Sequence, residues 1–389
     1  MVLAAASLGA LLGVTTTGVM VGGNMAPSSA SDTLVEHRPP ADTPVPPSQT
    51  LLVWMTGALP EGLDGDIGRL PEVGGVTAVR MGLVHLAAWA DAGGSQVDEP
   101  PGGFVIPLEV MAYDRSTYGE FLPASVRDDF ARLGGGGAIL GATSARLRGL
   151  TSGGRLQFDN GVALTVASVV DDALIGAAEA AVSTETATTL GIHDARYLLV
   201  SHDGDRAQVE AAIRALLPPD GAVRIRAPSE TPVLRHGDAV LPQVTIKERF
   251  GEFAYRPSGD GTFQVDATWE AEHLVSTELP IVGRVRCHRE LVAALSGAFS
   301  ELQERNLAYL VRSDGFAGCW NPRFISGSDA ISRHAWGAAV DINAGKNPTG
   351  LLSVQDRRLV DVMERWGFTW GGHWLVPDPA HFEYLRPPQ

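Results

Sequence analysis

Five side chains able to bind metal or transfer protons gather in two short stretches near the C-terminal end of the sequence. They are two imidazoles and three carboxylates in "ISRHAWGAAVDINAG" and "WGGHWLVPDPAHFEY": His334, Asp341, Asp378, His381 and Glu383. Two imidazoles and one carboxylate are the ligand set expected for a catalytic zinc ion, which keeps a fourth position for water. A further carboxylate can accept a proton from that water, as a zinc hydrolase requires. These residue types predict a site that binds one metal ion and activates one water molecule.

The first stretch predicts a strand that carries one of the carboxylates. "GAAVDIN" alternates, so Ala339, Asp341 and Asn343 are expected on one face and Val340 and Ile342 in the core. A carboxylate on a strand is held in a defined direction, which a metal ligand requires.

The neighbouring residues predict how the other side chains reach the same point. Gly337 allows the backbone to turn between His334 and that strand. Asp378 precedes a proline and is therefore expected in extended or polyproline geometry, in which Asp378 and His381 lie on one side. Strand alternation then places Glu383 on the same face as His381.

The two stretches resemble a known peptidase family. "SRHAWGAAVDIN" matches the S-x-H-x-x-G-x-A-x-D motif of the peptidase M15 family, which includes VanY-like D-alanyl-D-alanine carboxypeptidases and L-alanyl-D-glutamate endopeptidases of peptidoglycan. "GFTWGGHWLVPDPAHFEY" is similar to the second motif of that family, an acidic residue three positions before a His that is followed by Phe-Glu. The resemblance covers roughly residues 245–387. It implies a Zn²⁺-dependent hydrolase.

The resemblance implies a role for each matched residue. The implied zinc ligands are His334, Asp341 and His381, the implied general base is Asp378, and the neighbours implied to orient the ligands are Ser332 and Glu383. Arg323, in "CWNPRF", matches an arginine that meets substrate or transition-state charge, and a surface arginine is the alternative. His373 departs from the family, whose endopeptidase-like members often have "WGGDW", so its contact with metal or substrate stays open.

The preceding region is expected to form a separate α+β domain, residues 51–232. "GAILGATSARLRGLTSGGRLQF" and "ALTVASVVDDALIGAAEA" resemble the extracytoplasmic domain of MacB/FtsX-type ABC-transporter permeases. Those permeases have several membrane helices and this chain offers one candidate, so the resemblance does not imply transport. We expect a binding or spacing module, with a protein partner as one expectation.

The C-terminal domain, residues 245–389, is also predicted to be α+β, with packed helices on an antiparallel sheet. "CHRELVAALSGAFSELQERN" predicts a helix with one apolar face, formed by Leu291, Leu295, Phe299 and Leu302. "LAYLV" predicts a strand. "SVQDRRLVDVMERWG" predicts a second helix that begins with a capping-box variant at Ser353 and ends before Gly367.

The N-terminal residues predict export. Residues 1–25 contain no charged side chain and are expected to be a signal peptide or a membrane anchor, with anchoring through residues 2–23; a buried core helix is the alternative. A Pro/Ser/Thr-rich linker is expected at residues 26–50. The protein is therefore expected outside the cytoplasm, secreted or anchored to the outer face of the cytoplasmic membrane.

The net charge argues against one class of partner, and the cysteine content predicts a disulfide. The net charge of -15 disfavours nucleic acid as a partner, because nonspecific phosphate binding needs clustered Lys and Arg. Cys287 and Cys319 are the only cysteines, and in an exported chain they most simply form one disulfide; two buried free thiols are the alternative.

The sequence as a whole predicts a zinc metallopeptidase that hydrolyses peptidoglycan peptides, of the carboxypeptidase or the endopeptidase type. One alternative is a non-catalytic cell-wall binding or sensing protein with a structural zinc, in which His373 would be the fourth ligand. Another is a peptidase for protein substrates. The cleaved bond and the oligomeric state stay open.

Overall fold

The computed structural model describes residues 49–219, 221–238 and 240–387. All described residues belong to one compact unit of the chain, residues 43–389. The predicted signal peptide or anchor lies outside the described residues, as does nearly all of the predicted linker. No helix in the described part of the chain is long and apolar enough to span a membrane.

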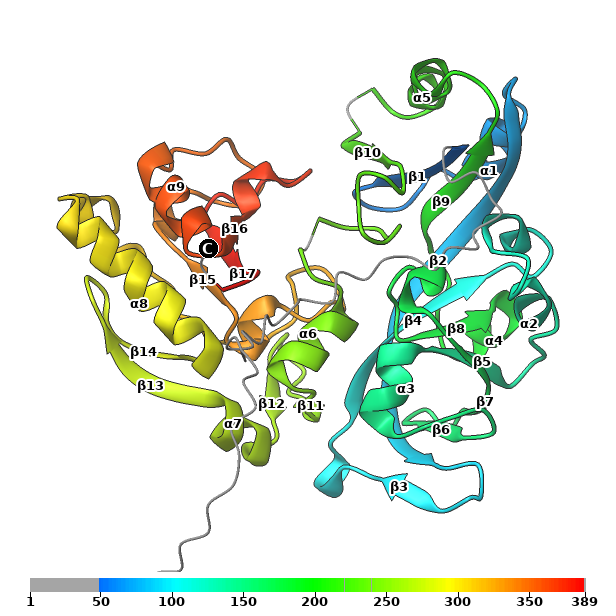
Figure 1. Cartoon of the computed structure of the whole chain (residues 1–389), viewed down its shortest axis with the longest axis horizontal. Helices are drawn as coiled ribbons and strands as arrows, with labels where there is room; N and C mark the ends of the chain where they lie inside the picture. Colours follow the sequence, from blue (N-terminus) through cyan, green and yellow to red (C-terminus); the bar gives the residue numbers. More distant parts are fainter. Residues whose placement is uncertain (1–48, 220, 239, 388–389) are drawn as a thin grey trace, which may run out of the picture. The chain divides into compact units, whose positions relative to one another are not determined.

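Residues 50–226 build one large mixed sheet of ten strands (Figure 1). The order is β10-β1-β9-β2-β4-β8-β5-β7-β6, and β3 pairs with β2. The β4–β8 and β5–β7 pairs are parallel and all others are antiparallel. The strands are β1 (Thr50–Met55), β2 (Val73–Ala90), β3 (Gln96–Asp98), β4 (Ile106–Tyr113), β5 (Gly137–Gly141), β6 (Arg155–Phe158), β7 (Ala163–Val170), β8 (Ala180–Ser183), β9 (Ala195–His202) and β10 (Val223–Arg226).

Short helices connect these strands and cover apolar faces of the sheet. Helix α5 shows how the local sequence sets them: Asp205 caps its N-terminus by accepting a hydrogen bond from the Gln208 N–H, and Val209 and Ile213 are buried on its inner face. The helices of this region are α1 (Leu63–Gly68), α2 (Arg127–Ala131), α3 (Ala142–Arg148), α4 (Thr184–Thr189) and α5 (Arg206–Ala215).

The described residues of the C-terminal region form three small antiparallel sheets and four α-helices. The sheets are β11–β12, β13–β14 and β15-β17-β16. The elements are α6 (Gln243–Phe250), β11 (Tyr255–Pro257), β12 (Phe263–Val265), α7 (Ala267–His273), β13 (Leu274–Leu279), β14 (Gly283–His288), α8 (Arg289–Glu304), β15 (Ala339–Asp341), α9 (Arg357–Arg365), β16 (Phe368–Trp370) and β17 (His381–Tyr384).

Short 3₁₀ turns complete both regions. They are η2 (Pro101–Gly103), η3 (Tyr118–Phe121), η4 (Asp172–Ile175), η5 (Ala308–Leu310), η6 (Ser313–Gly315), η7 (Arg333–Trp336), η8 (Ala344–Lys346) and η9 (Gly371–His373). The α+β class and the small antiparallel sheet with packed helices are confirmed.

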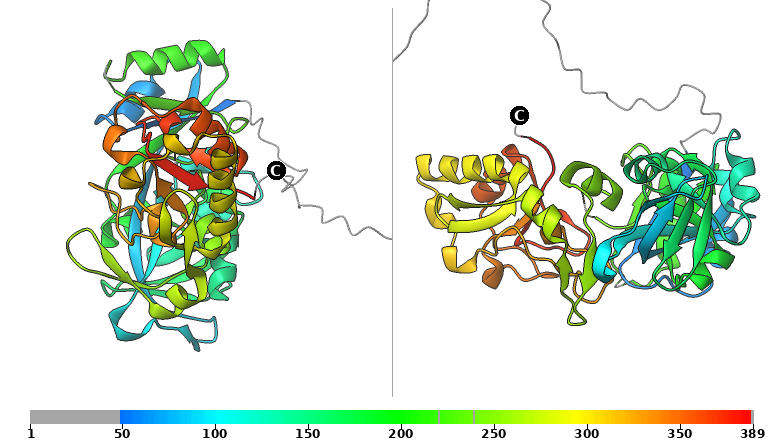
Figure 2. Two further views of the ribbon diagram at one scale, coloured as in Figure 1. Left: turned by 90° about the vertical axis from the view of Figure 1, so that its left-hand side faces the viewer. Right: turned by 90° about the horizontal axis from the view of Figure 1, so that it is seen from below.

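Helix α8, yellow in Figures 1 and 2, packs against the β13–β14 hairpin and against α9. All four residues of its predicted apolar face are buried. Gly297 is the contact point with the Trp366 ring, because a Cβ at Gly297 would lie 2.1 Å from that ring. The glycine therefore lets the aromatic side chain pack directly against the helix backbone.

Three local predictions were wrong. "LAYLV" forms the 3₁₀ turn η5 and not a strand. Asn306 turns the chain with φ 57°, and the Leu307 N–H closes the end of α8 by donating to the Leu302 carbonyl. Asp356, not Ser353, caps α9, since its carboxylate accepts the Arg358 N–H. Asn343 leaves the strand with φ 58°, and its side chain binds the carbonyl of Leu310.

The predicted disulfide between Cys287 and Cys319 is confirmed. Both cysteines are fully buried. Cys287 lies in β14, and Cys319 lies in the loop that precedes His334. The cross-link therefore holds this loop against the hairpin, close to the chain that carries the first candidate ligand.

Candidate metal centre

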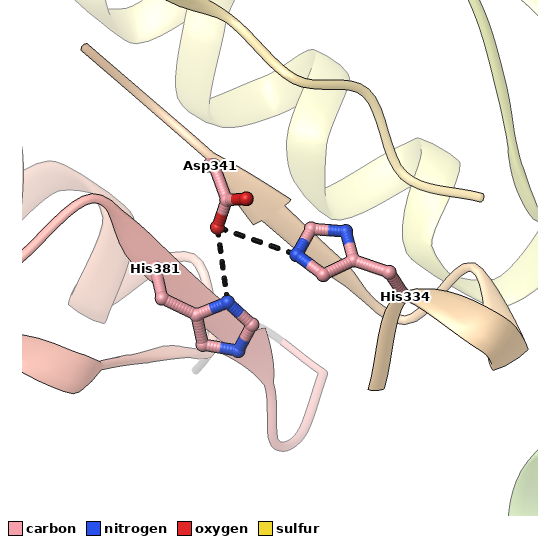
Figure 3. Close-up of side chains that lie close together, drawn as sticks. All are labelled: His334, Asp341 and His381. Carbon is pink, nitrogen blue, oxygen red and sulfur yellow. Dashed lines mark hydrogen bonds and ion pairs between the residues drawn. The ribbon is translucent and has the colours of Figure 1, made fainter. Parts of the chain in front are cut away.

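Three predicted ligands come together from different elements of the C-terminal region. His334 lies in η7, Asp341 ends β15 and His381 begins β17. One ligand atom from each of the three lies within 4.8 Å of the others (Figure 3). Asp341 and His381 are direct cross-strand partners in the antiparallel β15–β17 pair, and side chains at such positions face the same side of the sheet.

The turn around His334 is determined by its neighbours. Ser332 caps η7 and its Oγ accepts the His334 N–H at 3.4 Å. Gly337 follows with φ 64°, and a Cβ there would lie 2.7 Å from the backbone nitrogen of His288. Only glycine tolerates both the conformation and the close approach, so the predicted role of Gly337 as a turning point agrees with the structure.

Each histidine is held by one ring nitrogen and presents the other to the centre. The Nδ1–H of His334 donates to the carbonyl of Cys319 at 3.2 Å, which leaves Nε2 facing Asp341 at 3.3 Å. The Nε2 of His381 lies 3.4 Å from the Glu383 carboxylate, which leaves Nδ1 facing Asp341 at 3.0 Å. Such outer partners define the tautomer of a metal-binding histidine.

The charges in the group stabilise one another. Burial by itself raises the pKa of Asp341, but hydrogen bonds from His334 and His381 outweigh it and hold that pKa well below its usual range. Burial lowers the pKa of His381, but hydrogen bonds to Asp341 and Glu383 outweigh it and raise the pKa to about 9. Burial likewise raises the pKa of Glu383, and the hydrogen bond from His381 with the charge of Arg333 lowers it below its usual range.

The donor set fits a catalytic zinc ion. Two imidazoles and a carboxylate converge, and the described residues contribute no fourth His, Cys, Asp or Glu to the group. The side chain of His373 is 61% exposed and lies 3.9 Å from Glu364 and 3.4 Å from Arg357. A closed structural site with His373 as its fourth ligand has no support in this arrangement.

A cavity of about 440 Å³ adjoins the candidate ligands. His381 lines it together with the other predicted site residues Asp378, Arg323, Ser332 and Glu383. The cavity is within the range of roughly 300–1,000 Å³ that encloses small ligands in proteins.

Asp378 is half-buried and reaches this cavity from a turn. The His381 N–H donates to the Asp378 carbonyl at 3.1 Å, so residues 378–381 form a hydrogen-bonded turn and not the expected polyproline segment. Burial raises the pKa of the Asp378 carboxyl. The positive charge of His381 opposes this rise, and the negative charge of Asp341 adds to it. A raised pKa suits a group that must both accept and release a proton near neutral pH.

Gly371 lies against Asp378, and Arg323 lines the same cavity. A Cβ at Gly371 would lie 2.7 Å from the Asp378 carbonyl and 3.4 Å from the His381 Cβ, so the backbone approaches both residues closely. Arg323 lines the cavity, and its guanidinium donates to the neighbouring Phe324 carbonyl at 3.4 Å. The described residues place no carboxylate within ion-pair distance of Arg323.

Two residues at the site were missed from sequence. The ring of Trp374 lies 5.3 Å from that of His381 and lines the cavity. Arg333 also lines the cavity, and its charge acts on Glu383. Arg333 stands directly before His334 and Trp374 directly after His373, so their position inside the two motifs was the available signal.

The chain is similar to two solved structures, each over less than half of its length. The chain is similar to the periplasmic region of MacB from Actinobacillus actinomycetemcomitans, at 11% identity and a TM-score of 0.33, over 47% of this chain and 90% of that one. It is also similar to the extracellular domain of the noncanonic ABC-type transporter YknZ from Gram-positive bacteria, at 14% identity and a TM-score of 0.29, over 42% of this chain and 88% of that one.

A search of curated proteins found no match. A family model described as D-alanyl-D-alanine carboxypeptidase matches residues 326–384. That range contains the three candidate ligands and Asp378, and it begins after Arg323. The part of the chain that holds the candidate metal centre is thus similar to the D-alanyl-D-alanine carboxypeptidases.

Proposed function

We propose that this protein is a zinc-dependent peptidase that hydrolyses peptidoglycan stem peptides, by carboxypeptidase or endopeptidase cleavage. The observation that carries the proposal is the convergence of His334, Asp341 and His381 beside a cavity that Asp378 also lines. The match of residues 326–384 to D-alanyl-D-alanine carboxypeptidases supports the same reaction class.

A zinc ion held by the three side chains would supply Lewis-acid chemistry, polarising the scissile carbonyl and lowering the pKa of a water molecule. Asp378 accepts the proton from the attacking water and returns it to the leaving amine. Arg323 faces the cavity with its planar guanidinium, which suits a substrate carboxylate or the negative charge that develops on the carbonyl oxygen.

The remaining predicted residues act by positioning. Glu383 holds the ring of His381 through Nε2, and Ser332 caps the turn that carries His334. Fixing the rings in this way lowers the reorganisation that metal binding and catalysis would otherwise require.

Peptidoglycan is an extracytoplasmic substrate, so the proposal includes export, with residues 2–23 as a signal or anchor. The disulfide supports an oxidising compartment. Residues 51–232 would then be an extracytoplasmic module that binds substrate or a protein partner.

The test is hydrolysis of defined muropeptides by purified residues 43–389, followed by mass spectrometry. With zinc, we expect loss of a terminal D-alanine or cleavage after L-alanine, and a chelator should abolish the reaction. Asp361→Asn is a suitable control, because Asp361 is exposed on α9 and pairs with Arg357. Intact muropeptides in the presence of folded, zinc-loaded protein would refute the proposal and favour a non-catalytic cell-wall binding protein.

A further inference from the structure

The cavity beside the candidate metal centre is not built by the C-terminal region alone. Residues of the large N-terminal sheet line it as well: Trp54 on β1, Met81 on β2 and Glu109 on β4. These residues belong to the same compact unit as Asp378 and His381. A ligand that fills the cavity from Asp378 outward would therefore meet side chains of both regions.

Buried charges connect the two regions near this cavity. The carboxylate of Glu179, directly before β8, accepts hydrogen bonds from Arg148 at 3.0 Å and from Lys247 of α6 at 2.8 Å. All three side chains are fully buried. Gln243 of α6 also donates to Glu179 at 3.0 Å. Replacing one member of this set would leave an unpaired charge in the interior, which is strongly destabilising.

The same carboxylate holds the strand that carries Glu109. The Glu109 N–H donates to Glu179 Oε1 at 3.1 Å, and the Glu179 N–H donates to the Glu109 carbonyl at 2.9 Å. The backbone position of Glu109 is therefore tied to the charge cluster that joins α6 to the sheet. Its side chain is placed by the fold and not by a flexible loop.

The connecting chain contacts the candidate centre directly. The Val240 N–H donates to Glu383 Oε2 at 3.3 Å, and Arg333 donates to the Leu241 carbonyl at 2.9 Å. Glu383 is the residue that holds His381. The preceding part of this segment, residues 235–238, also lines the cavity.

The part of the cavity lined by the N-terminal sheet has the chemistry of a peptide-binding surface. Trp54 and Met81 are partly buried apolar side chains. The side-chain carboxyl of Glu109 lines the cavity and forms no hydrogen bond or ion pair within the described ranges 49–219, 221–238 and 240–387. Burial raises its pKa, and the positive charge of Arg333 opposes the rise. Arg333 brings positive charge to the same space. Apolar contact with a few placed polar groups is typical of a ligand-binding pocket.

We propose that the N-terminal sheet forms part of the substrate site, with Trp54, Met81 and Glu109 selecting peptides long enough to extend from Asp378 to these residues. The inference rests on the proposed peptidase function and adds to it a substrate class, oligopeptides in preference to the shortest cleavable fragment. Glu109 accepts N–H groups of the peptide, and Trp54 with Met81 contacts its apolar parts.

The first test compares kcat/KM for a stem pentapeptide and for the shortest peptide that the wild-type enzyme cleaves. Trp54→Ala and Met81→Ala should each lower kcat/KM for the pentapeptide by ~10-fold or more, the usual effect of lost apolar contact in a pocket, and leave the short peptide unchanged. Val97→Ala is the matched control, since Val97 is 46% exposed on β3 and lies outside the cavity. Equal losses on both peptides, or no loss on either, would overturn the proposal.

The second test measures binding of the pentapeptide in the absence of catalysis. The indole N–H signal of Trp54 in residues 43–389, assigned with Trp54→Phe, should shift when pentapeptide is added to zinc-free protein. Because this readout needs no turnover, it separates the two proposals. A shift in a protein that cleaves nothing when loaded with zinc would refute the peptidase function and retain the composite site. An unchanged Trp54 signal at saturating pentapeptide would overturn the composite site, whatever the activity.

Discussion

Replacing Asp378 by asparagine separates catalysis from metal binding. The amide is nearly isosteric with the carboxylate but cannot accept and return the proton. We expect kcat to fall by a factor of ~10²–10⁴, the usual contribution of a positioned acid–base group, which corresponds to about 3–5 kcal/mol of transition-state stabilisation.

The structure predicts that fold and metal content are retained in Asp378→Asn. Asp378 is not one of the three grouped candidate ligands. Its backbone holds the turn, through its N–H to the Gly371 carbonyl at 2.9 Å and its carbonyl to the His381 N–H at 3.1 Å, and neither contact needs the carboxylate. The loss should therefore appear in kcat and not in zinc stoichiometry or in the thermal unfolding midpoint.

The assay measures muropeptide cleavage and bound zinc in parallel for Asp378→Asn, Asp361→Asn and His373→Ala. The exposed control Asp361→Asn should behave as wild type. His373→Ala should retain zinc, because the His373 side chain is largely exposed and faces Glu364. Full activity in Asp378→Asn would refute the assignment of the base, and release of zinc by His373→Ala would restore the structural-zinc alternative.

Three further predictions concern the centre and its support. His334→Ala and His381→Ala should each lose the single bound zinc in elemental analysis, and undiminished zinc in both would contradict the ligand assignment. Gly371→Ala should lower kcat at least ~10-fold with zinc retained, because the added Cβ would lie 2.7 Å from the Asp378 carbonyl; wild-type kcat would contradict this. Burial lowers the pKa of His288 from 6.5 to about 4. His288 therefore binds a proton more tightly in the unfolded chain than in the folded protein. The free energy of unfolding should fall by up to about 3 kcal/mol as pH falls from 6.5 to 4. Denaturant titrations should show a smaller fall in His288→Gln, and an identical fall would contradict it.

Local sequence was sufficient for the features that depend on neighbours along the chain. A glycine turn separates His334 from Asp341, and Gly337 adopts there a positive φ that is open to glycine and disfavoured for other residues. His381 and Glu383 share a face because strand side chains alternate. The buried face of α8 follows from helical periodicity in the same way. These contacts needed no knowledge of the rest of the fold.

Tertiary structure decided which distant groups meet. The register of β15 against β17 places Asp341 opposite His381, and a shift of one residue would move His381 to the other face of the sheet. The Cys319 carbonyl that holds His334 comes from a disulfide-linked loop, and Glu109 reaches the cavity from a strand far earlier in the sequence. The sequence by itself thus determined which reactive side chains are present and how those within one motif lie, because these features depend on local geometry. How the two motifs and the N-terminal sheet meet depends on long-range packing and strand register, which no short motif encodes.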